Sequence, residues 1–326
     1  MTTTAPPEDR TAQFGDYLRI ARLGHVTKHV FVVPGILLAL LLRGDQSGGL
    51  LFNLVAGFAS MTAVASANYV INEWLDRESD AFHPEKSLRA AVQRELSPRV
   101  VLAEYAAFLL AGLALAWAVN PTFLVVAVLF AVSGVTYNVR PARTKDRVFV
   151  DVLTESVNNP IRLTAGWAMV DGATLPPGSL LLAFWFGGAF LMNSKRLAEY
   201  RDIVASDGKE ILGRYRRSFR FYTESSLSVA NLVYALLCSF FIAIFLIKYR
   251  IEYILLFPCI VALFGVYYAL SLRPGSVARK PEVLYRSGPV LATAALASAV
   301  FVLATFVDMP VFEELTDQRY ILLWGE

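Results

Sequence analysis

Long apolar segments recur along almost the whole sequence, and they restrict the possible folds more than any other feature. A helix needs roughly 20 mainly apolar residues to cross the hydrocarbon core of a bilayer. Lipid offers the backbone no hydrogen-bond partners, and these runs are longer than barrel strands, so the spans are predicted to be helical. We therefore predict an all-α, polytopic integral membrane bundle. About nine segments qualify as spans: Val26–Leu42, Leu50–Ile71, Val100–Val119, Phe123–Val139, Phe149–Val170, Leu180–Asn193, Leu227–Ile247, Ile251–Leu272 and Gly288–Val307.

Composition agrees with a membrane protein. Charged residues make up 17% of the chain and hydrophobic residues 56%, whereas a soluble domain carries about a quarter charged residues. Residues 1–25 are polar and lack an apolar core, so we expect a cytoplasmic tail and no cleavable signal peptide. We expect the transmembrane catalytic domain at residues 26–308 and a C-terminal tail at residues 309–326.

Lysine and arginine are distributed unequally between the two predicted membrane faces. The N-terminal segment and the loops after the even-numbered spans hold 25 of the 30 basic residues, and the opposite face holds four. By the positive-inside rule, the N-terminus and the even-numbered loops lie in the cytoplasm of a multi-pass protein of the inner (plasma) membrane, and the C-terminus lies on the opposite side. A basic face can also simply hold anionic lipid, but here acidic residues gather on the same side.

The first polar motif follows the second span. Asn72, Asp76 and Asp80 recur at intervals of four residues, which places them on one face of a continuing helix. Like charges at that spacing destabilise a helix unless a cation compensates them. Mg²⁺ carried by a phosphorylated substrate would do so, because it prefers a few carboxylates plus phosphate oxygens. The alternative is a solvated acidic helix end, balanced by the basic residues nearby.

The second motif runs from the fourth span into the fifth. Asp151, Glu155, Asn158 and Arg162 step by 4, 3 and 4 residues, which predicts one helical face. Ionisable groups in a membrane helix are costly, so we expect them to face the bundle interior. Glu155 and Arg162 can alternatively form a purely structural network between helices.

The third motif lies where the sixth span ends. Lys195, Glu199 and Asp202 form a further helical stripe, and a loop of interleaved basic and aromatic residues follows at 214–222. Such a loop alone is typical of binding to nucleic acid or lipid headgroups. Beside two acidic motifs it favours phosphate binding, with membrane-anchoring arginines as the alternative. We expect no nucleic-acid partner.

Together these motifs resemble the UbiA superfamily of membrane prenyltransferases, and more specifically its polyprenyl-phosphate (decaprenyl-phosphate) phosphoribosyltransferase branch. The most specific part is the segment after the second span, which reads Asn72-Glu73-x-x-Asp76-x-x-x-Asp80-x-x-His83-Pro84-x-Lys86-x-x-Arg89. Further similarity lies at Tyr137, Lys145, Asp151, Arg162 and Gly166, at Lys195-Arg196-Leu197-Ala198-Glu199, and at Tyr268 with Pro281-Glu282.

The sequence departs from this branch at several positions. Glu73 replaces the usual Asp, which keeps the carboxylate but changes its reach, and Ala90 replaces a Pro. A Gly usual nearby is missing from Val92-Gln93-Arg94, and the early Trp-x-Lys-Asn reads Val26-Thr27-Lys28-His29. These changes leave the exact donor and acceptor open.

The resemblance implies an Mg²⁺-dependent enzyme that takes 5-phosphoribosyl 1-diphosphate as donor and a polyprenyl phosphate as acceptor. It implies Glu73, Asp76 and Asp80 as ligands of the Mg²⁺–diphosphate, with Asp76, Asp80, Lys145 and Lys195 catalytic. The remaining expected substrate contacts are Lys28, Asn72, His83, Lys86, Arg89, Tyr137, Asp151, Arg162, Arg196, Glu199 and Asp202.

Two other functions stay open. An aromatic prenyltransferase of the same superfamily would share the fold but consume a prenyl diphosphate. A transporter or structural membrane protein would use the ionisable residues differently, although we find no internal repeat of the kind transporters show. The length of the polyprenyl tail and the oligomeric state, including a homo-oligomer, are not fixed by the sequence.

Overall fold

The computed structural model describes residues 11–45, 48–83, 85–206, 208–273 and 287–316. These residues form helices joined by short loops, and none of them lies in a β-strand apart from an isolated bridge between Thr11 and Glu95. The chain divides into two compact units, residues 1–176 with 199–227, and residues 177–198 with 228–326. The all-α prediction is confirmed.

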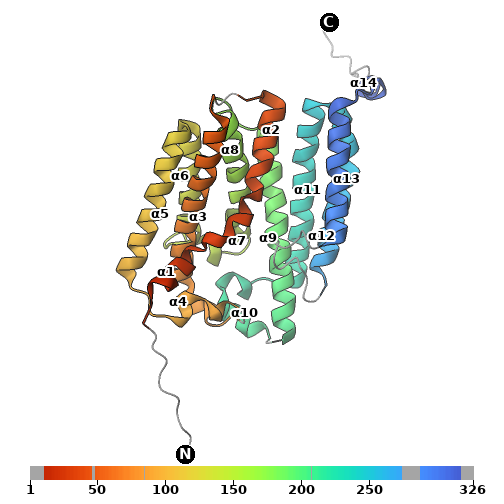
Figure 1. Ribbon diagram of the computed structural model, residues 1–326. Coiled ribbons are helices and arrows are strands. Elements are labelled where there is room, and N and C mark those ends of the chain that lie inside the picture. The colour runs from red at the N-terminus through yellow and green to blue at the C-terminus, as the bar shows by residue number, and fades with distance from the viewer. Residues whose placement is uncertain (1–10, 46–47, 84, 207, 274–286, 317–326) are drawn as a thin grey trace, which may run out of the picture. The chain divides into compact units, whose positions relative to one another are not determined.

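The first unit contains most of the helices (Figure 1). Its elements are α1 (Phe14–Ala21), η1 (Leu23–Val32), α2 (Val33–Arg43), α3 (Leu50–Asp80), η2 (Lys86–Leu88), α4 (Ala90–Gln93), α5 (Pro98–Val119), α6 (Pro121–Asn138), η3 (Thr144–Asp146), α7 (Val150–Ser156), α8 (Asn158–Val170), α10 (Lys209–Tyr215) and η4 (Arg217–Arg220).

Helix α3 lies at the centre of this unit, in contact with α1, α5, α6 and α8. Its buried face carries small residues, including Ala56, Gly57 and Ser60, which let neighbouring backbones approach closely. Ser60 donates a hydrogen bond of 2.7 Å to the carbonyl of Gly112 on α5. Close packing therefore fixes the position of α3 from its apolar half to its polar end.

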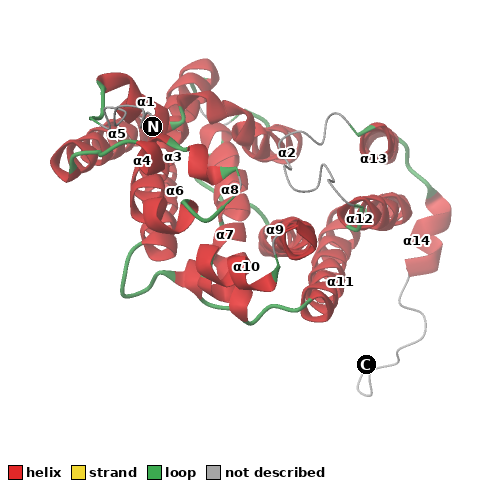
Figure 2. Cartoon of the chain, turned by 90° about the horizontal axis from the view of Figure 1, so that it is seen from below, coloured by secondary structure: helices red, strands yellow, loops and turns green. Residues whose placement is uncertain are grey.

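The second unit holds the remaining membrane helices. It comprises residues 178–198 of α9 (Gly178–Ser206), most of α11 (Glu224–Tyr249), η5 (Ile251–Leu256), α12 (Phe257–Ser271), α13 (Gly288–Phe306) and α14 (Pro310–Thr316). Aromatic contacts join these helices, as between Phe190 and Phe264, whose ring centroids are 4.8 Å apart. Figure 2 shows α12 beside α13, and Tyr253 of η5 stacks on Phe301 of α13 at 5.0 Å.

Six helical stretches among the described residues are long and apolar enough to cross a membrane: α3, α5, α6, α11, η5 with α12, and α13. The expected total of nine is not confirmed on this criterion. Residues 26–42 form a 3₁₀ stretch followed by the 11-residue α2. Residues 180–193 lie in α9, whose 29 residues become polar beyond Met192.

The fifth expected segment, Phe149–Val170, is not one continuous helix, and this corrects a prediction about the second motif. We expected one continuous helical face from Asp151 to Arg162, but α7 ends at Ser156 and α8 begins at Asn158. Pro160 lies in the first turn of α8, where it has no N–H to donate to the preceding turn. The Asp151 and Arg162 parts of the motif therefore belong to two separate helices.

Candidate active site

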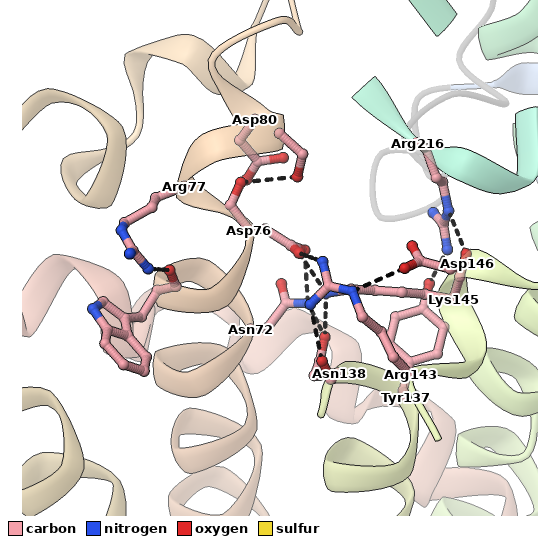
Figure 3. A network of polar contacts seen from close by, with 12 residues as sticks. Asn72, Asp76, Arg77, Asp80, Tyr137, Asn138, Arg143, Lys145, Asp146 and Arg216 are labelled. Atoms are coloured by element: carbon pink, nitrogen blue, oxygen red, sulfur yellow. Dashed lines mark hydrogen bonds and ion pairs between the residues drawn. The ribbon is translucent and has the colours of Figure 1, made fainter. Parts of the chain in front are cut away.

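The predicted acidic motif occupies the last three turns of α3. The helix continues to Asp80, as expected, so Asn72, Asp76 and Asp80 lie on one face. Asn72 donates hydrogen bonds from Nδ2 to Asn138 Oδ1 of α6 at 2.5 Å and to Asp76 Oδ2 at 3.3 Å. The end of α3 is thereby tied to the end of α6 (Figure 3).

Asp76 lies at the centre of a polar network. Its Oδ1 accepts hydrogen bonds from Lys145 Nζ at 2.5 Å and from Arg143 at 3.1 Å. Lys145 also donates to Asn138 Oδ1 at 2.8 Å. Burial lowers the pKa of Lys145 to about 8, although Asp76 acts to raise it and Arg143 lowers it further. Lys145 therefore remains mainly protonated at neutral pH, as a phosphate-binding cation must be.

Arg143 is held in a strained conformation at the start of η3. Its φ angle of 28° is positive, which a residue with a side chain rarely adopts. The guanidinium group contacts three acceptors: Asp76, Asp146 Oδ2 at 3.0 Å and the Asn138 carbonyl at 3.1 Å. Backbone strain kept in place by such contacts is typical of functional sites.

The other two acidic residues of the motif have cations of their own. Glu73 accepts hydrogen bonds of 2.6 and 2.9 Å from Arg22, which follows α1. Asp80 forms an ion pair with Arg89. Each acidic residue of the motif thus faces a different basic side chain, and within the described parts of the chain no three His, Cys, Asp or Glu side chains converge as a metal-binding group.

His83 and Lys86 join the first motif to the third. His83 Nδ1 accepts hydrogen bonds from the backbone N–H groups of Glu85 and Lys86, so the ring proton lies on Nε2 and is donated to Glu199 Oε1 at 3.0 Å. Lys86 Nζ lies 3.8 Å from the same carboxylate oxygen. Residues 116 positions apart in sequence thus meet beside the end of α3.

Tyr137 and Asp151 belong to a network around Arg216, the residue before η4. Arg216 donates to the Tyr137 hydroxyl, which itself donates to Glu155 Oε2 at 2.8 Å. Arg216 also lies 3.4 Å from Asp151 Oδ2, and Tyr222 donates to Asp151 Oδ1 at 2.5 Å. Because Arg216 also contacts the backbone carbonyl of residue 145 at 3.2 Å, this network supports the loop that carries Lys145.

The remaining predicted site residues are distributed more widely. Arg162 lies on α8 and forms no ion pair within the described structure. Lys195 and Arg196 belong to the second unit, and Asp202 lies on the part of α9 in the first unit. The side chain of Lys28 lies outside the described residues, as do Pro84 and the Pro281-Glu282 motif.

The sequence reasoning missed three basic residues that complete these networks. Arg143 and Arg216 lie in predicted loops and Arg22 in the predicted N-terminal tail, and none of the three is a predicted site residue. The predicted carboxylates that they contact, Glu73, Asp76 and Asp151, lie 51 to 67 residues away in sequence, so no local spacing reveals these pairs. Because buried charges are paired, each buried carboxylate implies a cation nearby, but the sequence does not indicate which one.

The donor set is compatible with Mg²⁺. Asp76 and Asp80 lie one turn apart on the same helix face, and Mg²⁺ is commonly bound by one or two carboxylates together with substrate phosphates. The surrounding lysine and arginine side chains are suited to phosphate oxygens. The fold and these residues define a helical membrane protein with a charge-dense cluster of carboxylates and basic side chains at one end of its first unit.

Comparison with known proteins agrees with that class. The sequence model of the UbiA prenyltransferase family matches residues 31–286, and the chain belongs to this family. Its members are prenyltransferases, so the protein is assigned to a family of membrane transferases. Comparison with curated proteins gives no significant match.

Solved structures show the same fold. A UbiA homolog from Archaeoglobus fulgidus bound to DMAPP and Mg²⁺ matches with a TM-score of 0.66 and 21% identity, over 90% of this chain and 100% of that chain. The same homolog bound to GPP and Mg²⁺ gives 0.66 and 22%, with the same coverage. A digeranylgeranylglyceryl phosphate synthase matches with a TM-score of 0.57 and 15% identity, over 89% and 95%.

Proposed function

We propose that the protein is an Mg²⁺-dependent polyprenyl-phosphate phosphoribosyltransferase. It transfers 5-phosphoribose from 5-phosphoribosyl 1-diphosphate to a polyprenyl phosphate and releases diphosphate. The bond between ribose C1 and the diphosphate oxygen breaks, and a bond from C1 to a phosphate oxygen of the lipid forms. The lipid phosphate is already anionic at neutral pH, so the reaction requires no dedicated general base.

The observation that carries this proposal is the presence of two separate groups of cations beside the end of α3. Arg143 and Lys145 contact Asp76, whereas Lys86 lies beside Glu199 and Arg89 pairs with Asp80. The proposed donor carries phosphate at both ends, on C1 and on C5, and so offers an anion to each group. A prenyl diphosphate has only one charged end.

The chain's own side chains would bind and orient this donor. We assign Asp76 and Asp80, with Glu73, to holding Mg²⁺, which when bound stabilises the negative charge that develops on the leaving diphosphate. Lys145 and Arg143 contribute fixed positive charge at the same place. His83 positions Glu199, which in turn orients Lys86.

The wider assignments follow the family resemblance. We propose residues 26–308 as the catalytic domain and a plasma-membrane location, with the N-terminus and the charge-dense end of the first unit facing the cytoplasm. The soluble donor would then enter from the cytoplasm, while the acceptor reaches the site from the bilayer. Lys195, Arg196 and Asp202 remain proposed contacts to substrate.

A second candidate is an aromatic prenyltransferase that consumes a prenyl diphosphate. It is favoured by the structural similarity to the Archaeoglobus homolog, which was solved with DMAPP or GPP and Mg²⁺. Asp76, Asp80 and Lys145 would bind the diphosphate in that reaction as well, so these three residues are common to the two candidate functions.

One experiment separates them. The purified protein is incubated with Mg²⁺ and a polyprenyl phosphate, and either labelled 5-phosphoribosyl 1-diphosphate or labelled geranyl diphosphate with an aromatic acceptor. We expect a lipid-linked ribose phosphate, identified by mass spectrometry, in the first reaction. Product only in the second reaction would replace our proposal with the aromatic prenyltransferase, and turnover in neither would reject both.

A further inference from the structure

Arg162 on α8 is a cation in the interior of the first unit, and the described residues place no compensating anion in contact with it. Its Nε atom is shielded from solvent and has no hydrogen-bond acceptor among those residues, and the guanidinium lies 5.2 Å from the centre of the Phe130 ring. Glu155 and Tyr69 act on it only through longer-range electrostatics. A shielded charge without a paired partner is costly, so its retention calls for a ligand.

His29 of η1 also has an unused polar atom. The side chain is 4% exposed, and its Nε2 lies 3.2 Å from Thr62 Oγ1. Thr62 already donates its only hydroxyl proton to the Phe58 carbonyl at 2.7 Å. Nε2 must therefore carry the imidazole proton, and in the neutral ring Nδ1 is an acceptor, for which the described structure offers no partner.

Helix packing brings these two residues, the interior pair, to the same level of the unit. A Cβ atom on Gly166 of α8 would lie 2.1 Å from the carbonyl oxygen of Val32, so the two backbones touch there. Further along both helices Arg43 pairs with Asp171, which shows that α2 and α8 run parallel. His29 and Arg162 each lie about one helical turn before this contact, and the two side chains interact electrostatically.

We propose that the interior pair, His29 and Arg162, is the subsite for the phosphate monoester of the acceptor. A hydrogen phosphate group fits both atoms, because its anionic oxygens accept from Arg162 and its P–OH donates to His29 Nδ1. A carboxylate would satisfy Arg162 and leave Nδ1 without a donor. This inference rests on the proposed phosphoribosyl transfer.

The position of the pair suits that reaction. Arg162 lies within electrostatic range of Tyr69, which precedes Asp76 by seven residues, or about 10 Å along α3 at 1.5 Å per residue. That spacing accommodates a ribose between a diphosphate held near Asp76 and an acceptor phosphate held by the pair. Val30 and Val33, which follow His29 at the end of η1 and the start of α2, are exposed, which suits entry of a lipid from the bilayer.

Binding measurements on the purified full-length protein test the subsite. The ligands are farnesyl phosphate, inorganic phosphate, 4-hydroxybenzoate and Mg²⁺ with pyrophosphate, and the variants are Arg162→Gln and His29→Phe. We expect each variant to bind farnesyl phosphate about 10- to 100-fold more weakly, as loss of a hydrogen bond to a charged group predicts. Both should bind Mg²⁺ with pyrophosphate as the wild type does. Arg43→Gln makes the same change at the far end of α2 and should leave both affinities unaltered.

Each outcome decides the proposal. If farnesyl phosphate binds far more tightly than inorganic phosphate, the ligand of the subsite is a lipid phosphate. If the two bind equally and both variants lose this binding, the ligand is free phosphate. Unchanged farnesyl phosphate binding in both variants, or loss of 4-hydroxybenzoate binding alone, would overturn the subsite. If Arg162→Gln does not fold, Arg162→Lys and His29→Phe provide the same comparison. Failure of the wild type to bind Mg²⁺ with pyrophosphate would count against the proposed function and not against the interior pair.

Discussion

The carboxylates at the end of α3 are each held by a basic side chain from another segment of the chain. Arg22 binds Glu73, Lys145 and Arg143 bind Asp76, and Arg89 binds Asp80. A buried ion pair contributes little net stability, since the desolvation cost offsets much of the attraction. Fold stability alone therefore does not explain these pairs, and the proposed binding of Mg²⁺ and diphosphate gives them a function.

Replacement of Asp76 by Asn should reduce turnover at least about 100-fold, because it removes the charge that holds both the metal and the two basic residues. The change is nearly isosteric, so the protein should still be extracted as a folded species. The measurement is the initial rate at saturating Mg²⁺. Glu78→Gln is the control, since Glu78 lies on the same helix end but is exposed to solvent. Equal rates in the two variants would remove Asp76 from the site.

Replacement of Lys145 by Gln should raise the KM for the diphosphate donor about tenfold or more, through loss of a charged hydrogen-bond donor. Arg77→Gln is a matched control, because Arg77 is one residue from Asp76 in sequence yet points away from it, against Trp74 (Figure 3). Donor titrations at fixed acceptor concentration give the two KM values. An unchanged KM in Lys145→Gln would exclude this role.

At the residue scale, the sequence predicts which side chains are polar and on one face but not which ones pair. The spacing of Asn72, Asp76 and Asp80 is a property of one helix, and α3 has it. The partners Arg22, Arg143 and Arg216 are reached through tertiary contacts, which periodicity does not encode. The association of His83 with Glu199 is of the same kind, although both residues were predicted individually.

At the scale of elements, the contact between α2 and α8 depends on two glycines. A Cβ atom on Gly35 would lie 2.0 Å from the Leu163 carbonyl oxygen, and one on Gly166 would lie 2.1 Å from that of Val32. Backbone atoms occupy those positions, so no side chain can move aside to relieve the overlap.

Gly166→Ala should therefore destabilise the protein by about 1–3 kcal/mol, the range typical of overpacking. Gly15→Ala in α1 is the control, since no atom lies within 4 Å of its added Cβ and alanine favours a helix. Thermal unfolding in detergent should show a lower Tm for Gly166→Ala and none of that loss for Gly15→Ala. A Tm equal to that of the wild type in Gly166→Ala would contradict the backbone contact.

The sequence predicts individual helices less well where polar and apolar residues mix. Long apolar runs identify α3, α5, α6, α11, α12 and α13 closely. The same reasoning joined α7 and α8, because residue spacing alone does not reveal the break at Val157. Hydropathy also ends the predicted span at Asn193, although α9 continues to Ser206. A helix can continue past its apolar residues because its backbone hydrogen bonds do not depend on hydropathy.

At the scale of the whole molecule, the distribution of basic residues predicts how the chain lies in the bilayer. Asp45 follows α2 and Arg94 follows α4, so the positive-inside rule places them on opposite faces. In a variant without Cys238 and Cys259, a membrane-impermeant maleimide applied to intact cells should label Asp45→Cys and not Arg94→Cys. Permeabilised cells should show labelling of both, and the reverse pattern in intact cells would invert the topology.

The fold class follows from composition because a bilayer admits few architectures, and an apolar chain of this length has to be helical within it. The division into two compact units does not follow in the same way, because the boundary near Ala198 falls inside one continuous helix. The sequence becomes polar a few residues earlier, after Met192, but no turn signal marks the boundary itself.

The paired arrangement around Asp76 also links the occupancy of one ligand to that of another. If Asp76 binds the proposed metal through Oδ1, Lys145 and Arg143 lose that acceptor, and if these two turn to a phosphate, Asp76 loses their positive charge. Either ligand alone would break these ion pairs and leave one side without a partner. The two ligands together would give both sides a new partner. By thermodynamic linkage, magnesium and the diphosphate must then increase each other's affinity reciprocally, so the cooperativity of the site originates in the ion pairs of its unliganded state.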